Sequence, residues 1–395
     1  MLHAMVSTRA ASRKHHRMVD LFAGPGGLDV AAHWLGISVH GVEWDADACA
    51  TRRAAGLGTD QDDVRSVGPA DFPDATILAG GPPCQTYTMA GRGVGRQALN
   101  EVLTLVQQMA EGGDDVDSSV AGLGDERTGL VLQPLRWVLE AHQLGIPYDA
   151  VVLEQVPAVL PVWQAYRGVL EGVGYKVECG ILKTEEFGVP QTRRRAILIA
   201  NRTVKPRLPA PTHRPYRKGV SRDEGNPGLL PWNTMGDALD RPEPFTVISN
   251  YGSGGDPRAR GRRKSSEPSA TVTGKISRNR VVSHSDAELE RFSFSEAGRL
   301  QTFPPDYPWS GRAVAQQIGN AIPPRLAAHV LASALSLELE PDRLDSAVMS
   351  SWRGSRTELR ACSGDNEPGV GRQPARNTYS RDPASGASSH MAANP

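Results

Sequence analysis

The first half of the chain alternates between short apolar runs and longer stretches in which apolar residues recur every three to four positions. The short runs at residues 18–22, 37–42, 75–79 and 150–153 have the pattern of buried strands. The longer stretches, such as residues 128–142, have the spacing of amphipathic helices. Strands that alternate with helices predict an α/β fold with a mainly parallel sheet.

The pattern changes beyond residue 200. Residues 201–284 are rich in proline, glycine and arginine and contain only short strand-like runs, and this shift in composition marks a second domain. An apolar helix is expected at residues 326–337, and beyond about residue 341 apolar residues become scarce, which is typical of disorder. The expected segments are a disordered basic arm (1–17), a first domain (18–200) with an inserted excursion at about 94–124, a second domain (201–310), a C-terminal helical segment (311–340) and a disordered tail (341–395).

Charge is spread unevenly along a chain whose formal net charge is zero. Residues 201–283 contain 16 lysines and arginines against 7 acidic residues, which favours binding to phosphate groups; a solvated positive face is the alternative. No apolar stretch approaches the length of a membrane span, and residues 1–17 lack the apolar centre of a secretion signal. We therefore expect a cytoplasmic protein with no membrane partner.

Cys84 lies in the turn Gly80-Gly81-Pro82-Pro83-Cys84-Gln85, directly after the apolar run 75–79. The glycines and prolines end that strand abruptly, so the thiol should sit on a stiff turn at the strand's carboxyl end, where open α/β sheets bind ligands. A reactive thiol and a small buried hydrophobe both fit this pattern. The four cysteines of the chain are far apart, so neither a disulfide framework nor a metal site is expected.

Two acidic residues follow other predicted strands. Glu154 comes directly after residues 150–153, at the same edge as Cys84, and a carboxylate in such an apolar setting should have a raised pKa; a buried structural acid is the alternative. Glu43 follows residues 37–42, downstream of the turn Gly24-Pro25-Gly26-Gly27. Glycines let the backbone approach a ligand and a carboxylate accepts hydrogen bonds from ribose hydroxyls, which favours a ribose-bearing cofactor over a generic tight turn.

Three consecutive arginines, Arg193, Arg194 and Arg195, precede a predicted strand at residues 196–200. If the side chains alternate, Arg193 and Arg195 share one face and can offer guanidinium groups to a phosphate or a base carbonyl. A surface basic run is the alternative, but it leaves the nearby Gln191 unexplained.

In their order along most of residues 18–337, these motifs resemble those of the cytosine-C5 DNA methyltransferases of bacterial or phage type. The matching segments are Phe22-Ala23-Gly24-Pro25-Gly26-Gly27, Glu43-Trp44-Asp45, Gly81-Pro82-Pro83-Cys84-Gln85, Glu154-Gln155-Val156, Gln191-Thr192-Arg193-Arg194-Arg195, Arg299-Leu300-Gln301-Thr302-Phe303-Pro304 and Gly319-Asn320-Ala321.

The resemblance implies a Rossmann-like, S-adenosylmethionine-dependent methyltransferase domain at 18–200 and a smaller, irregular target-recognition domain at 201–310, with 311–340 returning to the catalytic domain. It implies methyl transfer to C5 of a flipped-out cytosine in duplex DNA through a covalent adduct between Cys84 and C6. Glu154 would contact the base, and Arg193 and Arg195 would hold the base and its phosphate. The residues implied to bind S-adenosylmethionine are Phe22, Gly24, Gly26, Gly27, Glu43, Trp44, Asp63, Pro83 and Asn320.

The resemblance also implies double-stranded DNA as the partner, a monomer, and a role in restriction-modification, with or without a cognate endonuclease. An RNA cytosine-C5 methyltransferase and a catalytically silent DNA-binding relative are the alternatives. Two features depart from the family pattern: Gln155 replaces the usual asparagine after the catalytic glutamate, and the excursion at 94–124 lengthens the segment that should close over DNA.

Overall fold

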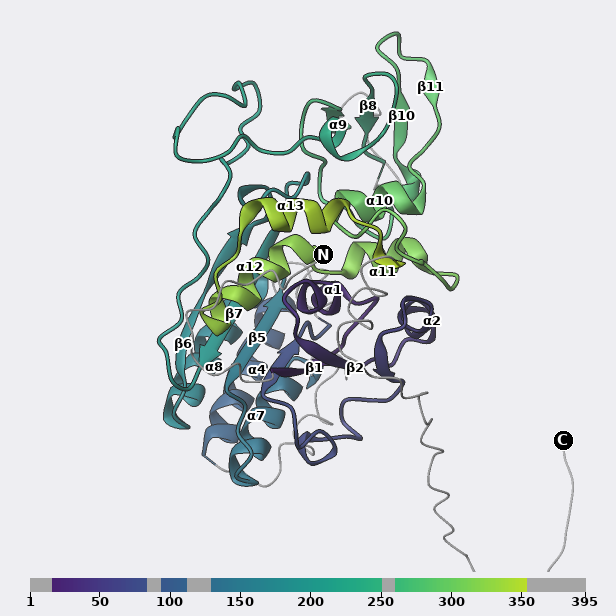
Figure 1. Cartoon of the computed structure of the whole chain (residues 1–395). Coiled ribbons are helices and arrows are strands. Elements are labelled where there is room, and N and C mark those ends of the chain that lie inside the picture. Colours follow the sequence, from purple (N-terminus) through teal and green to yellow (C-terminus); the bar gives the residue numbers. More distant parts are fainter. Residues whose placement is uncertain (1–15, 84–93, 112–128, 251–259, 354–395) are drawn as a thin grey trace, which may run out of the picture.

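A seven-stranded sheet forms the centre of the larger part of the molecule (Figure 1). The computed structural model describes residues 16–83, 94–111, 129–250 and 260–353. The strand order is β3-β2-β1-β4-β5-β7-β6, and every pair of neighbours is parallel except those of β7, which is antiparallel to β5 and β6. The strands are β1 (Arg17–Leu21), β2 (Ser38–Val42), β3 (Gly58–Asp60), β4 (Ile77–Gly80), β5 (Ala150–Gln155), β6 (Lys176–Lys183) and β7 (Arg194–Asn201).

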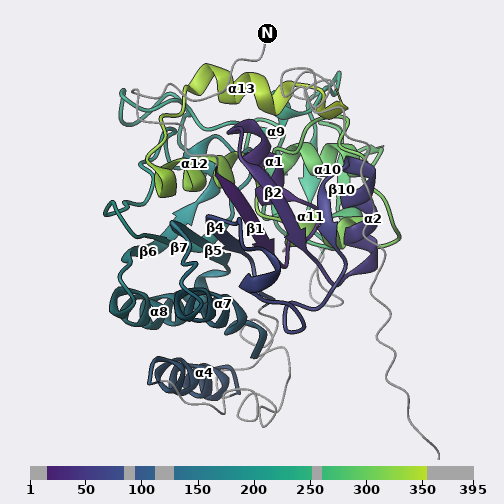
Figure 2. The same ribbon diagram turned by 60° about the horizontal axis from the view of Figure 1, so that its bottom comes forward.

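Helices cover both faces of this sheet, and Figure 2 shows the layers. Successive strand residues point to opposite faces: Ile77 and Ala79 join the core under α1 and α12, whereas Leu78 joins the core on the side of α7 and α8. The fold expected from the alternating pattern is thus confirmed. The helices of this part are α1 (Gly27–Trp34), α2 (Ala46–Ala55), α4 (Val94–Ala110), α7 (Gln133–Gln143), α8 (Leu160–Gly172), α12 (Pro324–Leu335) and α13 (Pro341–Met349).

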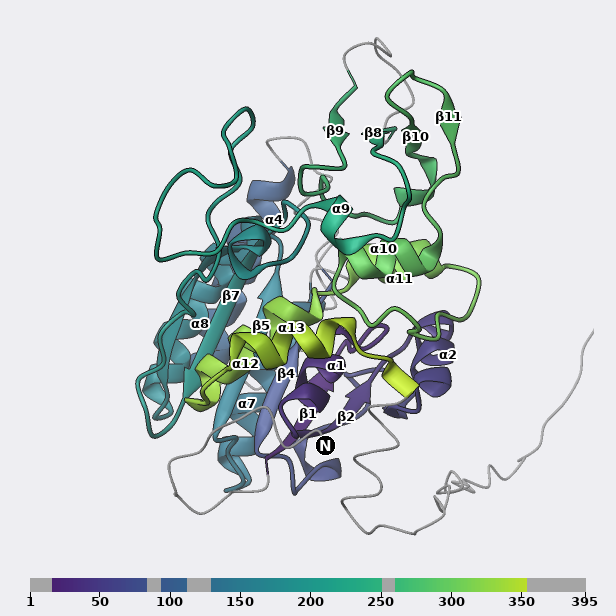
Figure 3. The same cartoon turned by 45° about the horizontal axis from the view of Figure 1, so that its top comes forward.

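A smaller part carries a four-stranded antiparallel sheet of order β11-β10-β8-β9, which stands above α10 and α11 in Figure 3. It has a core of its own, built around Phe245, Val272, Phe292 and Leu300. None of the helices in the described ranges is long and apolar enough to cross a membrane. The elements are α9 (Met235–Ala238), β8 (Thr246–Ile248), β9 (Arg262–Lys264), β10 (Arg280–Val282), β11 (Glu288–Leu289), α10 (Phe294–Leu300) and α11 (Val314–Asn320).

Buried polar side chains join the two parts. The Gln191 side chain accepts a hydrogen bond from the Val272 backbone N–H (2.7 Å) and donates one to Oε1 of Gln301 (2.7 Å). Arg193 donates to the carbonyl oxygens of Val272 and Gly319, both at 2.9 Å. Because these groups are buried, each would be costly to leave without its partner, so the joint holds the smaller sheet in a fixed place beside the larger one.

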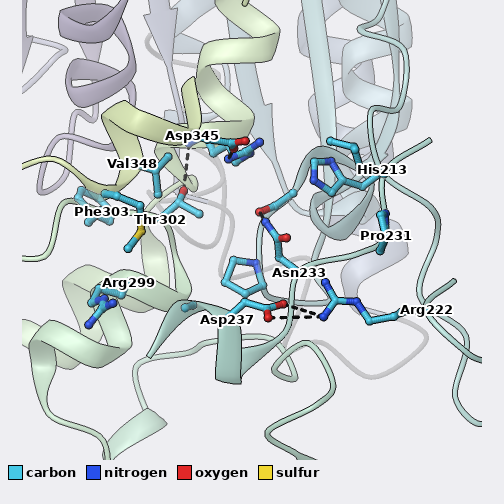
Figure 4. Close-up of a pocket in the computed structure, with 16 residues that line it drawn as sticks. His213, Arg222, Pro231, Asn233, Asp237, Arg299, Thr302, Phe303, Asp345 and Val348 are labelled. Carbon is cyan, nitrogen blue, oxygen red and sulfur yellow. Dashed lines mark hydrogen bonds and ion pairs between the residues drawn. The ribbon is translucent and has the colours of Figure 1, made fainter. Parts of the chain in front are cut away.

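A cavity of about 330 Å³ lies beside α13 and is lined by residues of both parts, among them Asp237 and Asp345 (Figure 4). Its lining includes Arg222, which pairs with Asp237 at 3.1 Å, and Arg325, which pairs with Asp345. The arginines that face this cavity therefore already have carboxylate partners. The cavity has charged walls, but these charges are already paired with one another.

The end of the described chain corrects one expectation. Helix α13 occupies residues predicted to begin a disordered tail at 341, and its Leu344 and Ala347 are buried in the core that also contains Trp352. The start of the predicted tail at 341 is therefore wrong, because the fold continues through residue 353. Residues 1–15 of the predicted arm, 354–395 of the tail and 112–124 of the excursion lie outside the described residues, and α4 forms the first part of that excursion.

Candidate active site

A second cavity, of about 680 Å³, opens at the carboxyl ends of the parallel strands. The loops that follow β1, β2, β3, β4 and β5 all contribute to its wall, and residues 319–322 at the end of α11 close one side. Strand order reverses between β1 and β4, and open α/β sheets bind ligands at such a switch point. The topology therefore places this cavity where the fold can hold a ligand.

The glycine turn after β1 forms one wall of the cavity. Gly24 and Gly26 have positive φ angles of 54° and 103°, which side chains other than glycine adopt with strain. A Cβ on Gly27 would lie 2.4 Å from the carbonyl oxygen of Ile322, so glycine is needed there for the α11–α12 connection to approach. Gly24, Gly27 and Phe22 line the cavity. Gly26 is not among the lining residues; it is the N-cap of α1.

Glu43, at the end of β2, is fixed by the backbone around it. Its two carboxylate oxygens accept hydrogen bonds from the N–H groups of Gly24 and Asp45, each at 2.7 Å. Burial raises the pKa of Glu43, and these two N–H groups oppose the rise. Each oxygen keeps a further lone pair for a ligand. The next residue, Trp44, lines the cavity with 72% of its surface exposed, so its ring is free to stack on a planar group.

A second acid, Asp63, lines the cavity in the loop after β3. Arg65 donates to both of its carboxylate oxygens, with Nε and Nη2 at 3.0 and 2.6 Å from Oδ2 and Nε at 3.1 Å from Oδ1. These hydrogen bonds keep the pKa of Asp63 low, so it is an ionised acceptor at neutral pH. Pro83 and Asn320 complete the part of the wall that the sequence predicted.

Glu154 and Arg195 form a buried ion pair on neighbouring strands β5 and β7, and both line the cavity. Burial raises the pKa of Glu154, and the positive charge of Arg195 opposes the rise. The alternation of side chains along the strand thus brings Arg195 to the site, as its position predicted. Arg193 is different: its guanidinium is bound at the joint and is not in the cavity wall, so the expectation that it holds the base or its phosphate does not fit this structure.

The turn after β4 passes directly beside Glu154. A Cβ on Gly81 would lie 3.4 Å from Oε2 of Glu154, and β4 pairs with β5 up to Gly80 and Leu153. Gln155 donates to the carbonyl oxygen of Pro82 at 2.6 Å, so the residue that replaces the usual asparagine ties β5 to the proline turn. Cys84 itself lies outside the described residues, two positions beyond this contact.

The sequence interpretation missed Asp20, which lines the cavity from within β1 and is almost fully buried. The signal was present, because an acidic residue inside an otherwise apolar strand is unusual. Among the described residues, no group of three or more histidine, cysteine or acidic side chains could hold a metal ion.

Comparison with known proteins agrees with this arrangement. The family model of the C-5 cytosine-specific DNA methylases matches residues 16–109, 118–227 and 229–336. The Type II methyltransferase M1.HphI of Haemophilus parahaemolyticus is 27% identical over 361 residues, which cover 81% of this chain and 86% of that protein. The Type II methyltransferase M.MthTI of Methanothermobacter thermautotrophicus is 25% identical over 358 residues, which cover 82% of this chain and 98% of that protein.

The fold has solved counterparts as well. The crystal structure of S. pombe Dnmt2 methyltransferase matches with a TM-score of 0.56 at 18% identity, over 81% of this chain and 98% of that one. At that identity the match concerns the fold alone, whereas the family model covers well over half of the sequence. The chain therefore belongs to the C-5 cytosine-specific DNA methylase family.

Proposed function

We propose that this cytosine-C5 DNA methyltransferase takes its methyl group from S-adenosylmethionine and forms a covalent adduct between Cys84 and C6 of the target cytosine. The observation that carries the proposal is the buried Glu154–Arg195 pair, which lies beside the turn leading to Cys84 on the wall of a nucleotide-sized cavity. A base held against that pair would lie next to the turn that leads to Cys84.

The cavity residues fit the proposed methyl donor. Its volume of about 680 Å³ lies within the usual range for cofactor sites. Glu43 offers lone pairs to the two ribose hydroxyls, Trp44 offers a ring to the adenine, and ionised Asp63 offers an acceptor to the adenine amine. When bound, S-adenosylmethionine supplies a methyl group on a positively charged sulfur.

The residues of this chain would supply the remaining steps. The Cys84 thiolate adds to C6, and Glu154 in its protonated form donates to N3, which stabilises the negative charge on the ring. The addition would make C5 nucleophilic toward the methyl group that bound S-adenosylmethionine would supply. A base removes the C5 proton, the C6–sulfur bond breaks, and the Cys84 thiolate is regenerated.

The smaller sheet is proposed to read the DNA. Its segment, residues 201–310, contains the basic excess of the chain and is locked beside the active cavity by Gln191 and Arg193. Phosphate contacts would position the duplex and base contacts would select the target. Because several relatives are Type II methyltransferases, we propose a restriction-modification role for this chain, as a monomer.

The test is methyl transfer from labelled S-adenosylmethionine to unmethylated duplex DNA, with transfer RNA as a parallel substrate. Duplex DNA containing 5-fluorocytosine should trap the enzyme as a covalent complex, because the fluorine cannot be removed as a proton would be. Cys84→Ser should lose at least about a thousandfold in rate and form no complex, since a hydroxyl is a far weaker nucleophile than a thiolate. Undiminished C5 methylation by Cys84→Ala would overturn the mechanism, and transfer to RNA alone would overturn the proposed substrate.

A further inference from the structure

Behind the glycine turn, the charge of a single arginine, Arg52, acts on three carboxyl groups, those of Asp20, Asp29 and Glu43, but its side chain contacts only one of them. Asp29 on α1 receives two hydrogen bonds from Arg52 on α2, at 2.8 and 2.7 Å, and both side chains are fully buried. The remaining Arg52 donors contact the carbonyl oxygens of Ala23 and Gly58 and the hydroxyl of Thr59. All five N–H groups of Arg52 are therefore engaged, and none is left for another acid.

Asp20 is the acid without such a partner. It lies on β1, is 1% exposed and lines the active cavity, and its Oδ1 has no hydrogen-bond partner. The charged groups that act on it are Asp29 from α1, Arg52 from α2 and Glu43 from the end of β2. Three ionised acids against one arginine would give this buried region a net charge of two negative units, which a low-dielectric site does not tolerate without a counterion.

A proton held by Asp20 or Asp29 would reduce this excess from two negative units to one. Burial first, and then the charge of Asp29, raise the pKa of Asp20 well above its ordinary value. A cation entering the cavity would supply the missing positive charge and make the proton unnecessary. Two close carboxyl groups that share one proton are an established way to tune such a site.

We propose that Asp20 senses the charge on the cofactor sulfur: it holds a proton in the empty cavity, releases that proton to solvent when the sulfonium form binds, and takes one up again when the thioether product remains. This inference rests on S-adenosylmethionine being the methyl donor. Methyl transfer removes the positive charge from sulfur, so the product leaves an ionised Asp20 without a counterion. The site would thereby distinguish donor from product by charge.

The inference gives the two ligands different pH dependences. A group that loses its proton on binding makes affinity rise with pH, by up to tenfold per pH unit between its bound and free pKa values. Affinity for S-adenosylmethionine should therefore rise with pH over the range in which Asp20 keeps its proton in the free protein, whereas affinity for S-adenosylhomocysteine should stay constant or fall. Sinefungin, which carries an ammonium group in place of the methylated sulfur, should behave like the donor.

The experiment is calorimetric titration of the full chain with each ligand, at several pH values and in two buffers of different ionisation enthalpy, which gives the number of protons released. Wild-type protein should release a proton with S-adenosylmethionine and sinefungin but not with S-adenosylhomocysteine. Asp20→Asn, which mimics the protonated acid, should bind all three without release and should prefer the donor less by about tenfold or more at pH 8. Glu140→Gln, on α7 and paired with Arg136 outside the cavity, is the matched control.

The possible results separate this inference from the proposed cofactor. If neither S-adenosyl compound binds, S-adenosylmethionine itself is refuted as the methyl donor. Binding of both with equal proton release, or with none, would refute only the role of Asp20, as would release that persists in Asp20→Asn. Should Asp20→Asn fail to fold, the wild-type comparison of donor with product still decides the question.

Discussion

At the residue scale, the balance within the Glu154–Arg195 pair decides whether the Glu154 carboxyl group is neutral or ionised. Burial favours the neutral acid, and the adjacent guanidinium favours the carboxylate. Both effects act on the carboxyl group together, which suits the proposed role of Glu154 as a proton donor to N3. Gln155 and Arg195 fix the position of this acid from two sides, through the proline turn and through β7.

Arg195→Gln should raise the pKa of Glu154, because burial then acts without the opposing positive charge. The protonated acid would persist to higher pH, so the alkaline limb of the kcat/KM profile should move upward in pH. The maximal rate should fall about a hundredfold, equivalent to about 3 kcal/mol, because a buried charged partner is lost. The fold should survive, since Glu154 can become neutral.

The measurement is the pH dependence of methyl transfer between pH 5.5 and 9.5. Arg194→Gln removes an exposed arginine from the adjacent position of the same strand and should leave the profile unchanged. If Arg195→Gln lowers the rate but does not move the alkaline limb, protonation of Glu154 does not control the reaction.

At the element scale, α13 shows how a short helix can be stable without a strong local signal. Serine, aspartate and arginine are interspersed among the apolar residues of 341–353, so the local composition resembles that of a tail. In the fold Leu344, Ala347 and Trp352 enter a core already formed by α1 and α12. Such stabilisation comes from tertiary packing and is invisible in a local pattern.

Trp352→Ala should destabilise the protein by about 3–5 kcal/mol, because a large side chain is lost from a packed core. The Trp352 side chain is 1% exposed, packs against the rings of His33 and Tyr307, and donates from Nε1 to the carbonyl oxygen of Ala55 at 3.1 Å. Urea denaturation measures the loss. Met349→Ala, at an exposed position of the same segment, should change stability by less than about 0.5 kcal/mol; equal effects of the two would mean that α13 is not docked as described.

At the scale of the whole molecule, the sequence could predict the sheet and most of the cavity wall, because both follow from local order. Glu43, Glu154 and the turn before Cys84 each lie at the carboxyl end of a strand. Because these strands are parallel, the three come together at one edge of the sheet. The role of Arg193 could not be predicted in this way. The alternation of side chains predicts the side of a strand on which a residue lies. It does not predict the contacts of Arg193 with Val272 and Gly319, because these residues are distant from it in the sequence.

Variants of Arg193 can therefore distinguish two roles for this residue: joining the larger and smaller parts of the protein, or binding a DNA phosphate. If Arg193 is a structural joint, it donates from two separate nitrogens, Nη1 to the carbonyl oxygen of Val272 and Nη2 to that of Gly319, whereas lysine has one shorter-reaching nitrogen to serve both. If it instead bound a DNA phosphate, lysine would preserve much of its function. Arg193→Lys should accordingly be nearly as damaging as Arg193→Met, and each should lose about 2–3 kcal/mol of stability because a buried carbonyl loses its donor.

The salt dependence of DNA binding is an independent test of whether Arg193 joins the two parts of the protein or contacts a DNA phosphate. Loss of a phosphate contact lowers the slope of log K against log salt by about one unit, whereas loss of a joint weakens binding without changing that slope. Arg278→Met, an exposed position in the basic segment, provides the comparison. An unchanged slope for Arg193→Met would support the structural role of Arg193. A reduced slope, together with good rescue by lysine, would mean that Arg193 contacts a DNA phosphate.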